Sequence, residues 1–81
     1  MSRVRIEIKY LKGVEDPEAL TIKKNLSILG FTGVSSINTV RSYEIEFSDD
    51  VRDPVAEARK MAEKLLVNPV IHDYEVTLAG E

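Results

Sequence analysis

The sequence contains no cysteine, no tryptophan and a single histidine among its 81 residues. Without cysteine the chain forms neither a disulfide nor a thiolate metal site, and one histidine excludes a histidine-rich metal centre. A nucleophilic triad needs a histidine base, for which only His72 is available. The glycines are isolated, so no glycine-rich loop cradles a phosphate. We therefore expect no catalytic, cofactor-binding or metal-ligating residues on this chain.

A strong charge of either sign and long apolar runs are also missing. The net charge is −3, with 11 basic residues scattered among 14 acidic ones, which argues against nucleic-acid binding. No apolar run approaches the roughly 20 residues of a membrane-spanning helix. The first residues, MSRVR, lead into an alternating pattern that is typical of neither a signal nor a transit peptide. The expectation is a cytoplasmic protein that contacts no membrane.

The chain is long enough for one domain, which we place at residues 1–81. A domain of this size buries only about 60% of the surface that its unfolded chain exposes. Small cores are usually reinforced by disulfides, a metal or a partner. Since the residues for the first two are missing, we expect self-association.

Apolar and polar residues alternate in three regions, which is typical of half-buried strands. The first is residues 4–10, and the last is residues 70–78, followed by a short tail at 79–81. Between them, residues 34–48 look extended, most strongly at 43–47. This region forms either two short strands joined near Asn38-Thr39 or one long strand that bends there.

Two helices are predicted after Asp-Pro pairs, because aspartate is a good N-cap and proline suits the first helical position. Asp16 caps the first helix, which Gly30 ends, and Asp53 caps the second, which Asn68-Pro69 ends. Each helix shows an apolar face at spacings of three and four residues. The faces are Ala19, Ile22, Leu26 and Leu29 in the first helix, and Val55, Ala58, Met61 or Ala62, and Leu65 in the second.

The order of these elements predicts an α+β protein. The expected architecture is a two-layer sandwich in which two helices cover one face of an antiparallel sheet of three to four strands. The connectivity is ferredoxin-like, β-α-β(-β)-α-β.

Candidate functional residues are expected at an interface. Unpaired strand edges invite pairing with another chain, and the Asn68-Pro69 corner and the sheet face opposite the helices are further candidates. His72 is expected to be a satisfied or solvent-facing strand residue rather than a catalytic base. The predicted interface residues are Arg5, Arg41, Glu44, Asn68, Pro69, His72 and Tyr74.

The C-terminal third, residues 61–76, reads MAEKLLVNPVIHDYEV and resembles the PurS family, the small subunits of phosphoribosylformylglycinamidine (FGAM) synthase. Residues 12–17, KGVEDP, are similar to the Val-x-Asp-Pro segment that precedes the first helix of that family. The resemblance covers nearly the whole chain. Ala19 stands where the family usually has glycine, and Val40-Arg41 stands where it often has Gly-Lys.

This resemblance implies a role in purine biosynthesis. The complex amidates formylglycinamide ribonucleotide with glutamine and ATP, and the small subunit bridges a glutaminase subunit and a large synthetase subunit and assists ammonia transfer. No cofactor is implied on the small subunit, since ATP and Mg²⁺ are expected on the large one. The family forms dimers or tetramers and has no catalytic residues on this subunit.

Two alternatives remain open at this point. The chain could be a small ligand-binding regulatory domain of the ferredoxin-like type, for which Arg41 near a strand junction is the hint. It could also be a small enzyme whose cleft forms at a dimer interface, with His72 as the residue to test.

Overall fold

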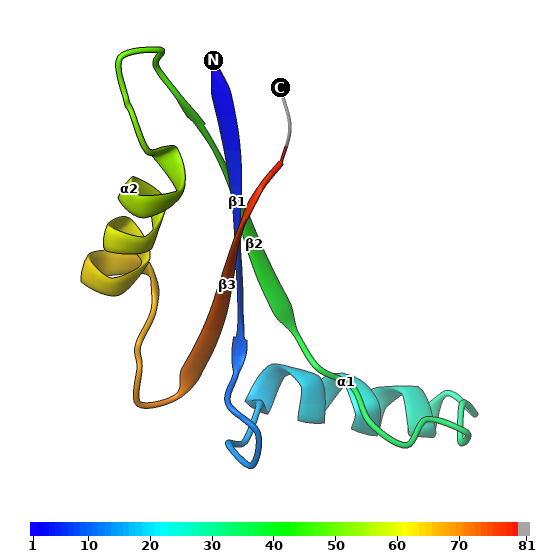
Figure 1. The fold of residues 1–81 in the computed structure, drawn as a ribbon. Coiled ribbons are helices and arrows are strands. Elements are labelled where there is room, and N and C mark those ends of the chain that lie inside the picture. The colour runs from blue at the N-terminus through cyan, green and yellow to red at the C-terminus, as the bar shows by residue number, and fades with distance from the viewer. Residues whose placement is uncertain (80–81) are drawn as a thin grey trace.

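The computed structural model describes residues 1–79, so residues 80–81 of the predicted tail lie outside the described part. Within residues 1–79 the elements follow the order β1 (Ser2–Tyr10), α1 (Pro17–Ile28), β2 (Val40–Phe47), α2 (Pro54–Met61), η1 (Ala62–Leu66) and β3 (His72–Leu78) (Figure 1). The predicted α+β class and the ferredoxin-like order are confirmed. The extended region at 34–48 becomes a strand only from Val40.

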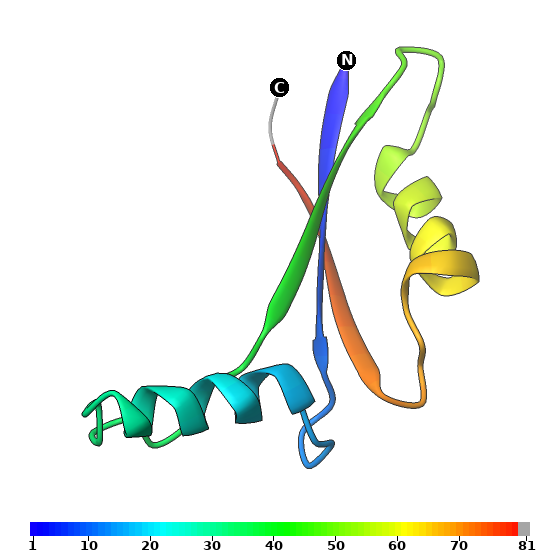
Figure 2. The ribbon, with the colours of Figure 1, turned by 180° about the vertical axis from the view of Figure 1, so that it is seen from behind.

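The sheet has β1 at its centre, with β2 and β3 antiparallel on either side. Ile6, in the middle of β1, pairs with Tyr43 and with Val76. The alternation along β1 directs Val4, Ile6 and Ile8 toward α2, and all three side chains are buried. The charged residues of β1 consequently lie on the opposite face, which no helix covers (Figures 1 and 2).

The second helix packs on the sheet through Ala58, and η1 continues this contact through Ala62; both residues are fully buried. After α2 the helix widens into the π-helical turn η1, in which the Val67 N–H donates to the Ala62 carbonyl at 2.9 Å. This wider turn rotates Leu66 toward the core and leaves Leu65 84% exposed. The prediction that Leu65 lies on the buried face was therefore wrong, and Ala62 rather than Met61 occupies the contact.

The first helix does not cover the sheet. Figures 1 and 2 show α1 pointing away from the end of the strands, with residues 29–39 returning beside it. We call α1 and residues 29–39 together the arm. The Cα radius of gyration is 16.2 Å, compared with about 12 Å for a compact chain of this length. The prediction that both helices cover one face thus holds for α2 only.

Asp16 fixes the direction in which the arm leaves the sheet. One carboxylate oxygen accepts the Ala19 N–H at 3.0 Å and caps α1. The other accepts both the N–H of Thr39, at 3.0 Å, and its hydroxyl, at 2.6 Å. One side chain therefore joins the start of α1 to the residue that precedes β2, and both ends of the arm are held at the edge of the sheet.

The far end of the arm is a Schellman turn. Gly30 has a φ of 101°, a left-handed conformation that glycine adopts without a steric penalty. Its N–H donates to Ser27, and the Phe31 N–H donates to Leu26 at 2.9 Å. This turn reverses the chain, and Lys23 then donates to the Ser35 carbonyl at 2.8 Å. The arm is therefore held together by its own hydrogen bonds.

The two helix caps are expected to differ in their effect on stability. Asp53→Ala removes only the bond to the Ala56 N–H and should cost about 1 kcal/mol of unfolding free energy. Asp16→Ala should lower Tm by more, because it also releases Thr39. Thermal unfolding followed by circular dichroism measures both, and Thr39→Val removes the hydroxyl bond alone. Equal losses for the two alanine variants would show that the Thr39 bonds contribute nothing.

Candidate functional site

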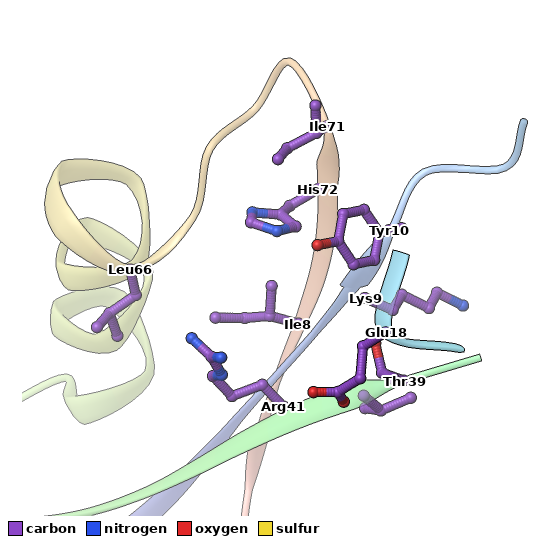
Figure 3. A pocket seen from close by; sticks show the side chains of 10 residues that line it. Ile8, Lys9, Tyr10, Glu18, Thr39, Arg41, Leu66, Ile71 and His72 are labelled. Atoms are coloured by element: carbon purple, nitrogen blue, oxygen red, sulfur yellow. The ribbon is translucent and has the colours of Figure 1, made fainter. Parts of the chain in front are cut away.

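A hollow of about 420 Å³ opens at the end of the sheet where α1 departs (Figure 3). It lies on the face that carries α2, at the end that α2 leaves uncovered and from which α1 points away. Strand, helix and loop residues line it: Ile8, Lys9, Tyr10, Glu18, Thr39, Val40, Arg41, Leu66, Ile71 and His72.

Three polar side chains on this face come from three different strands. Strand pairing places Arg41 of β2 opposite Ile8, and His72 of β3 opposite Tyr10. The rings of Tyr10 and His72 lie 5.2 Å apart, tilted by 59°. Residues 8, 10, 41 and 72 thus share one end of the sheet although two long connections separate them in sequence.

The predicted corner at Asn68 is a hydrogen-bonded turn. Its carbonyl accepts the His72 N–H at 2.7 Å, and its side-chain oxygen accepts the Val70 N–H at 3.1 Å. The Asn68 N–H donates to Nδ1 of His72 at 3.0 Å. Because Nδ1 of the neutral ring is an acceptor here, the proton lies on Nε2, which makes that nitrogen a donor. Asn68 therefore sets the tautomer of His72, and Pro69 next to it is exposed.

Tyr74, another predicted interface residue, contributes to packing within the chain. Its ring packs against the core, and its hydroxyl donates to Glu63 at 3.0 Å, joining β3 to η1. Burial raises the pKa of the Tyr74 hydroxyl, and the bond to Glu63 raises this pKa further. The side chain is half-buried, which leaves part of it available to a partner.

Arg5 and Glu44 lie on the sheet face opposite the helix and form a cross-strand ion pair at 2.8 Å. A second, longer pair joins Arg3 and Glu46 at 3.7 Å. The hydrogen bond from Arg5 lowers the pKa of the Glu44 carboxyl, and the same bond raises the pKa of the guanidinium. The predicted interface residues therefore occupy two sheet faces and a corner rather than one site.

Acid is expected to destabilise the fold. The bond from the Thr39 hydroxyl lowers the pKa of Asp16, as that from Arg5 lowers the pKa of Glu44. Both pKa values are lower in the folded than in the unfolded chain, so their stabilisation is complete above about pH 4–5 and is lost as the pH falls through the folded values. Urea unfolding from pH 7 to pH 2.5 should show this decline. Glu44→Gln should flatten it, and an unchanged curve for that variant would contradict the assignment.

The arm exposes an unusual amount of apolar surface. Ile28, Leu29 and Phe31 are 74%, 72% and 61% exposed, and Leu20 and Ile22 add to them. The predicted apolar face of α1 missed Leu20 and Ile28, which lie on its other sides. Large apolar side chains exposed in this number on one segment mark an interaction site. Leu20 and Ile28 were therefore the signal in the sequence that could have predicted the arm.

Neither a metal centre nor a membrane span is found in the described part of the chain. Residues 1–79 contain no group of three or more histidine, aspartate or glutamate side chains placed to hold a metal ion. None of their helices is long and apolar enough to cross a bilayer. A small α+β fold that leaves large apolar side chains of its arm exposed belongs to the class of proteins that work as subunits of an assembly.

Comparison with known proteins identifies the family. The family model PurS, described as phosphoribosylformylglycinamidine (FGAM) synthase, matches residues 3–80. The PurS subunit of Methanocaldococcus jannaschii is 40% identical over 77 residues, spanning 94% of this chain and 93% of that protein. The PurS subunit of Mycobacterium leprae is 34% identical, spanning 95% of each. The chain belongs to the PurS family, the small subunits of FGAM synthase in purine biosynthesis.

Solved structures agree with this assignment. The crystal structure of Methanocaldococcus jannaschii PurS matches with a TM-score of 0.87 and 37% identity, covering 100% of this chain and 99% of that chain. A structure of PurLQS from Thermotoga maritima contains a chain that matches with a TM-score of 0.75 and 31% identity, covering 95% of each. The resemblance predicted from residues 61–76 is thus confirmed over the whole fold.

Proposed function

We propose that this chain is the non-catalytic subunit that bridges the glutaminase and the large synthetase subunit and assists the transfer of ammonia between them. The observation that supports this most is the match to a chain of the Thermotoga maritima PurLQS structure. ATP and Mg²⁺ bind the large subunit in this proposal, and this chain holds no cofactor. A biosynthetic complex of this kind works in the cytoplasm, where we place the chain.

Self-association is the second part of the proposal, and its contact is the arm. The arm carries Leu20, Ile22, Ile28, Leu29 and Phe31 on its surface, and the core beneath α2 is small. If a second copy packs on the arm about a two-fold axis, the same residues are buried in both copies. The occupant that we assign to the exposed apolar side chains of the arm is therefore another copy of this chain, with the glutaminase and synthetase contacting other parts of the surface.

The test uses the purified glutaminase and synthetase subunits with and without this chain. Glutamine-dependent amidation of formylglycinamide ribonucleotide should require the chain, whereas amidation with added ammonium salt should depend on it far less. Pull-down of both partners by the tagged chain provides the binding readout. Equal glutamine-dependent turnover in the presence and absence of the chain would rule out the bridging role.

A further inference from the structure

The hollow at the end of the sheet contains hydrogen-bond donors without partners. Arg41 and the Tyr10 hydroxyl form no hydrogen bond or ion pair with any residue in 1–79. His72 presents Nε2–H, since Nδ1 is occupied by the Asn68 N–H. By contrast, Arg3 and Arg5 on the opposite face are both paired with glutamates. Three donors from three strands therefore surround a space that an oxyanion can fill.

A single carboxylate reaches the same hollow from the first turn of α1. Glu18 lines it, and its side chain accepts no hydrogen bond from the described residues. Figure 3 shows Glu18 and Arg41 bordering the same space. The Thr39 hydroxyl is already donated to Asp16. Among the side chains that line the hollow, the carboxylate of Glu18 is left to accept a hydrogen bond from a ligand. The polar groups of the hollow thus offer both signs of charge.

Lys9 also lines the hollow, but its side chain extends away from the space between Arg41 and His72 (Figure 3), and the remaining wall is apolar. Ile8 forms the floor of the hollow. Leu66 of η1 and Ile71, which directly precedes β3, line its side (Figure 3). A volume of about 420 Å³ lies within the range of about 300–1,000 Å³ that is usual for small-molecule sites. Ile8 is 5% exposed, so this floor is a fixed part of the core.

These features select among small ligands. A phosphate dianion would be repelled by Glu18, and a metal cation would be repelled by Arg41. A neutral apolar molecule would leave Arg41, the Tyr10 hydroxyl and Glu18 without a partner. A zwitterion satisfies both ends, because its carboxylate accepts from the donors while its ammonium group binds the carboxylate.

We propose that this hollow binds a free α-amino acid with an apolar side chain. Its carboxylate binds Arg41, Tyr10 and His72, and its ammonium group binds Glu18. Its side chain lies on Ile8, Leu66 and Ile71. This proposal does not rest on the bridging role, because binding is measured on the chain alone and bridging on the assembled subunits.

Isothermal titration calorimetry of the chain with L-leucine tests the proposal, and ¹H–¹⁵N spectra show whether each variant is folded. Saturable binding should shift the amide resonances of residues 10, 41 and 72. Arg41→Met should weaken binding at least about tenfold, through loss of charge-assisted hydrogen bonds. The matched control Arg3→Met removes an arginine from the opposite face and should leave affinity unchanged.

Glu18→Gln provides a second, independent test. It should weaken L-leucine about fivefold or more, through loss of the ion pair with the ammonium group. It should not weaken 4-methylpentanoate, which is leucine without that group. Three results would each overturn the site: no saturable binding, equal weakening by Arg41→Met and Arg3→Met, or equal weakening of both ligands by Glu18→Gln.

Discussion

Phe31→Glu is expected to convert the self-associated protein into a monomer of 9.1 kDa. Phe31 is 61% exposed at the tip of the arm, near Leu29, which is 72% exposed. Burying a phenylalanine contributes roughly 1.5–3 kcal/mol, and a two-fold contact counts it twice. Placing an unpaired carboxylate in the contact costs more still. The dissociation constant should therefore rise by about two orders of magnitude or more.

Sedimentation equilibrium over a range of concentrations measures this shift. The matched control is Leu65→Glu, which replaces an apolar residue that is even more exposed, 84%, but lies on η1 rather than on the arm. The control should keep the mass of the parent protein. If Phe31→Glu keeps it too, or if both variants dissociate alike, then the arm is not the contact between copies.

Phe31→Glu also tests whether glutamine-dependent turnover requires the self-associated chain. A monomeric Phe31→Glu chain should lose glutamine-dependent turnover in the reconstituted complex if the partners recognise the oligomer. Its far-ultraviolet circular dichroism should stay that of the parent, since Phe31 contributes no side chain to the buried core. Recovery of turnover at high chain concentration would follow from mass action.

The strands and helix caps were predictable from the sequence because their causes are local. The alternation of Val4, Ile6 and Ile8 determines which face of β1 is buried, and the Asp-Pro pairs place aspartate where N–H groups need an acceptor. The assignment to a family also relied on a continuous stretch, residues 61–76. Each of these signals is contained within a few residues of the chain.

The arm and the hollow depend on contacts between residues far apart in the sequence. Asp16 and Thr39 determine where α1 points, and they are 23 positions apart. The end of the sheet is open because α1 points away, and only then do Arg41 and His72 line a cavity. Periodicity suggested an ordinary buried face for α1 because it counted Ile22 and Leu26 but disregarded Leu20 and Ile28. The π turn at Ala62 likewise changes the helical period on which such patterns depend.

Ile6→Ala should produce the largest loss of stability in the chain. Ile6 is fully buried between Tyr43 and Val76 at the centre of the sheet. Truncating a buried isoleucine to alanine costs about 2–5 kcal/mol, out of the roughly 4–12 kcal/mol expected for a domain of this length. Urea unfolding with linear extrapolation measures the difference. The control Leu65→Ala, at an 84% exposed site, should stay within about 0.5 kcal/mol of the parent.

The dependence on protein concentration separates this core effect from the effect of the arm. Unfolding of a self-associated chain shifts to higher denaturant as concentration rises, because association stabilises the folded state by mass action. Ile6→Ala should lower the midpoint at every concentration and keep that dependence. Phe31→Glu should abolish the dependence and match the parent at the lowest concentration. The reverse pattern would mean that Ile6 supports the contact between copies and that the arm belongs to the core.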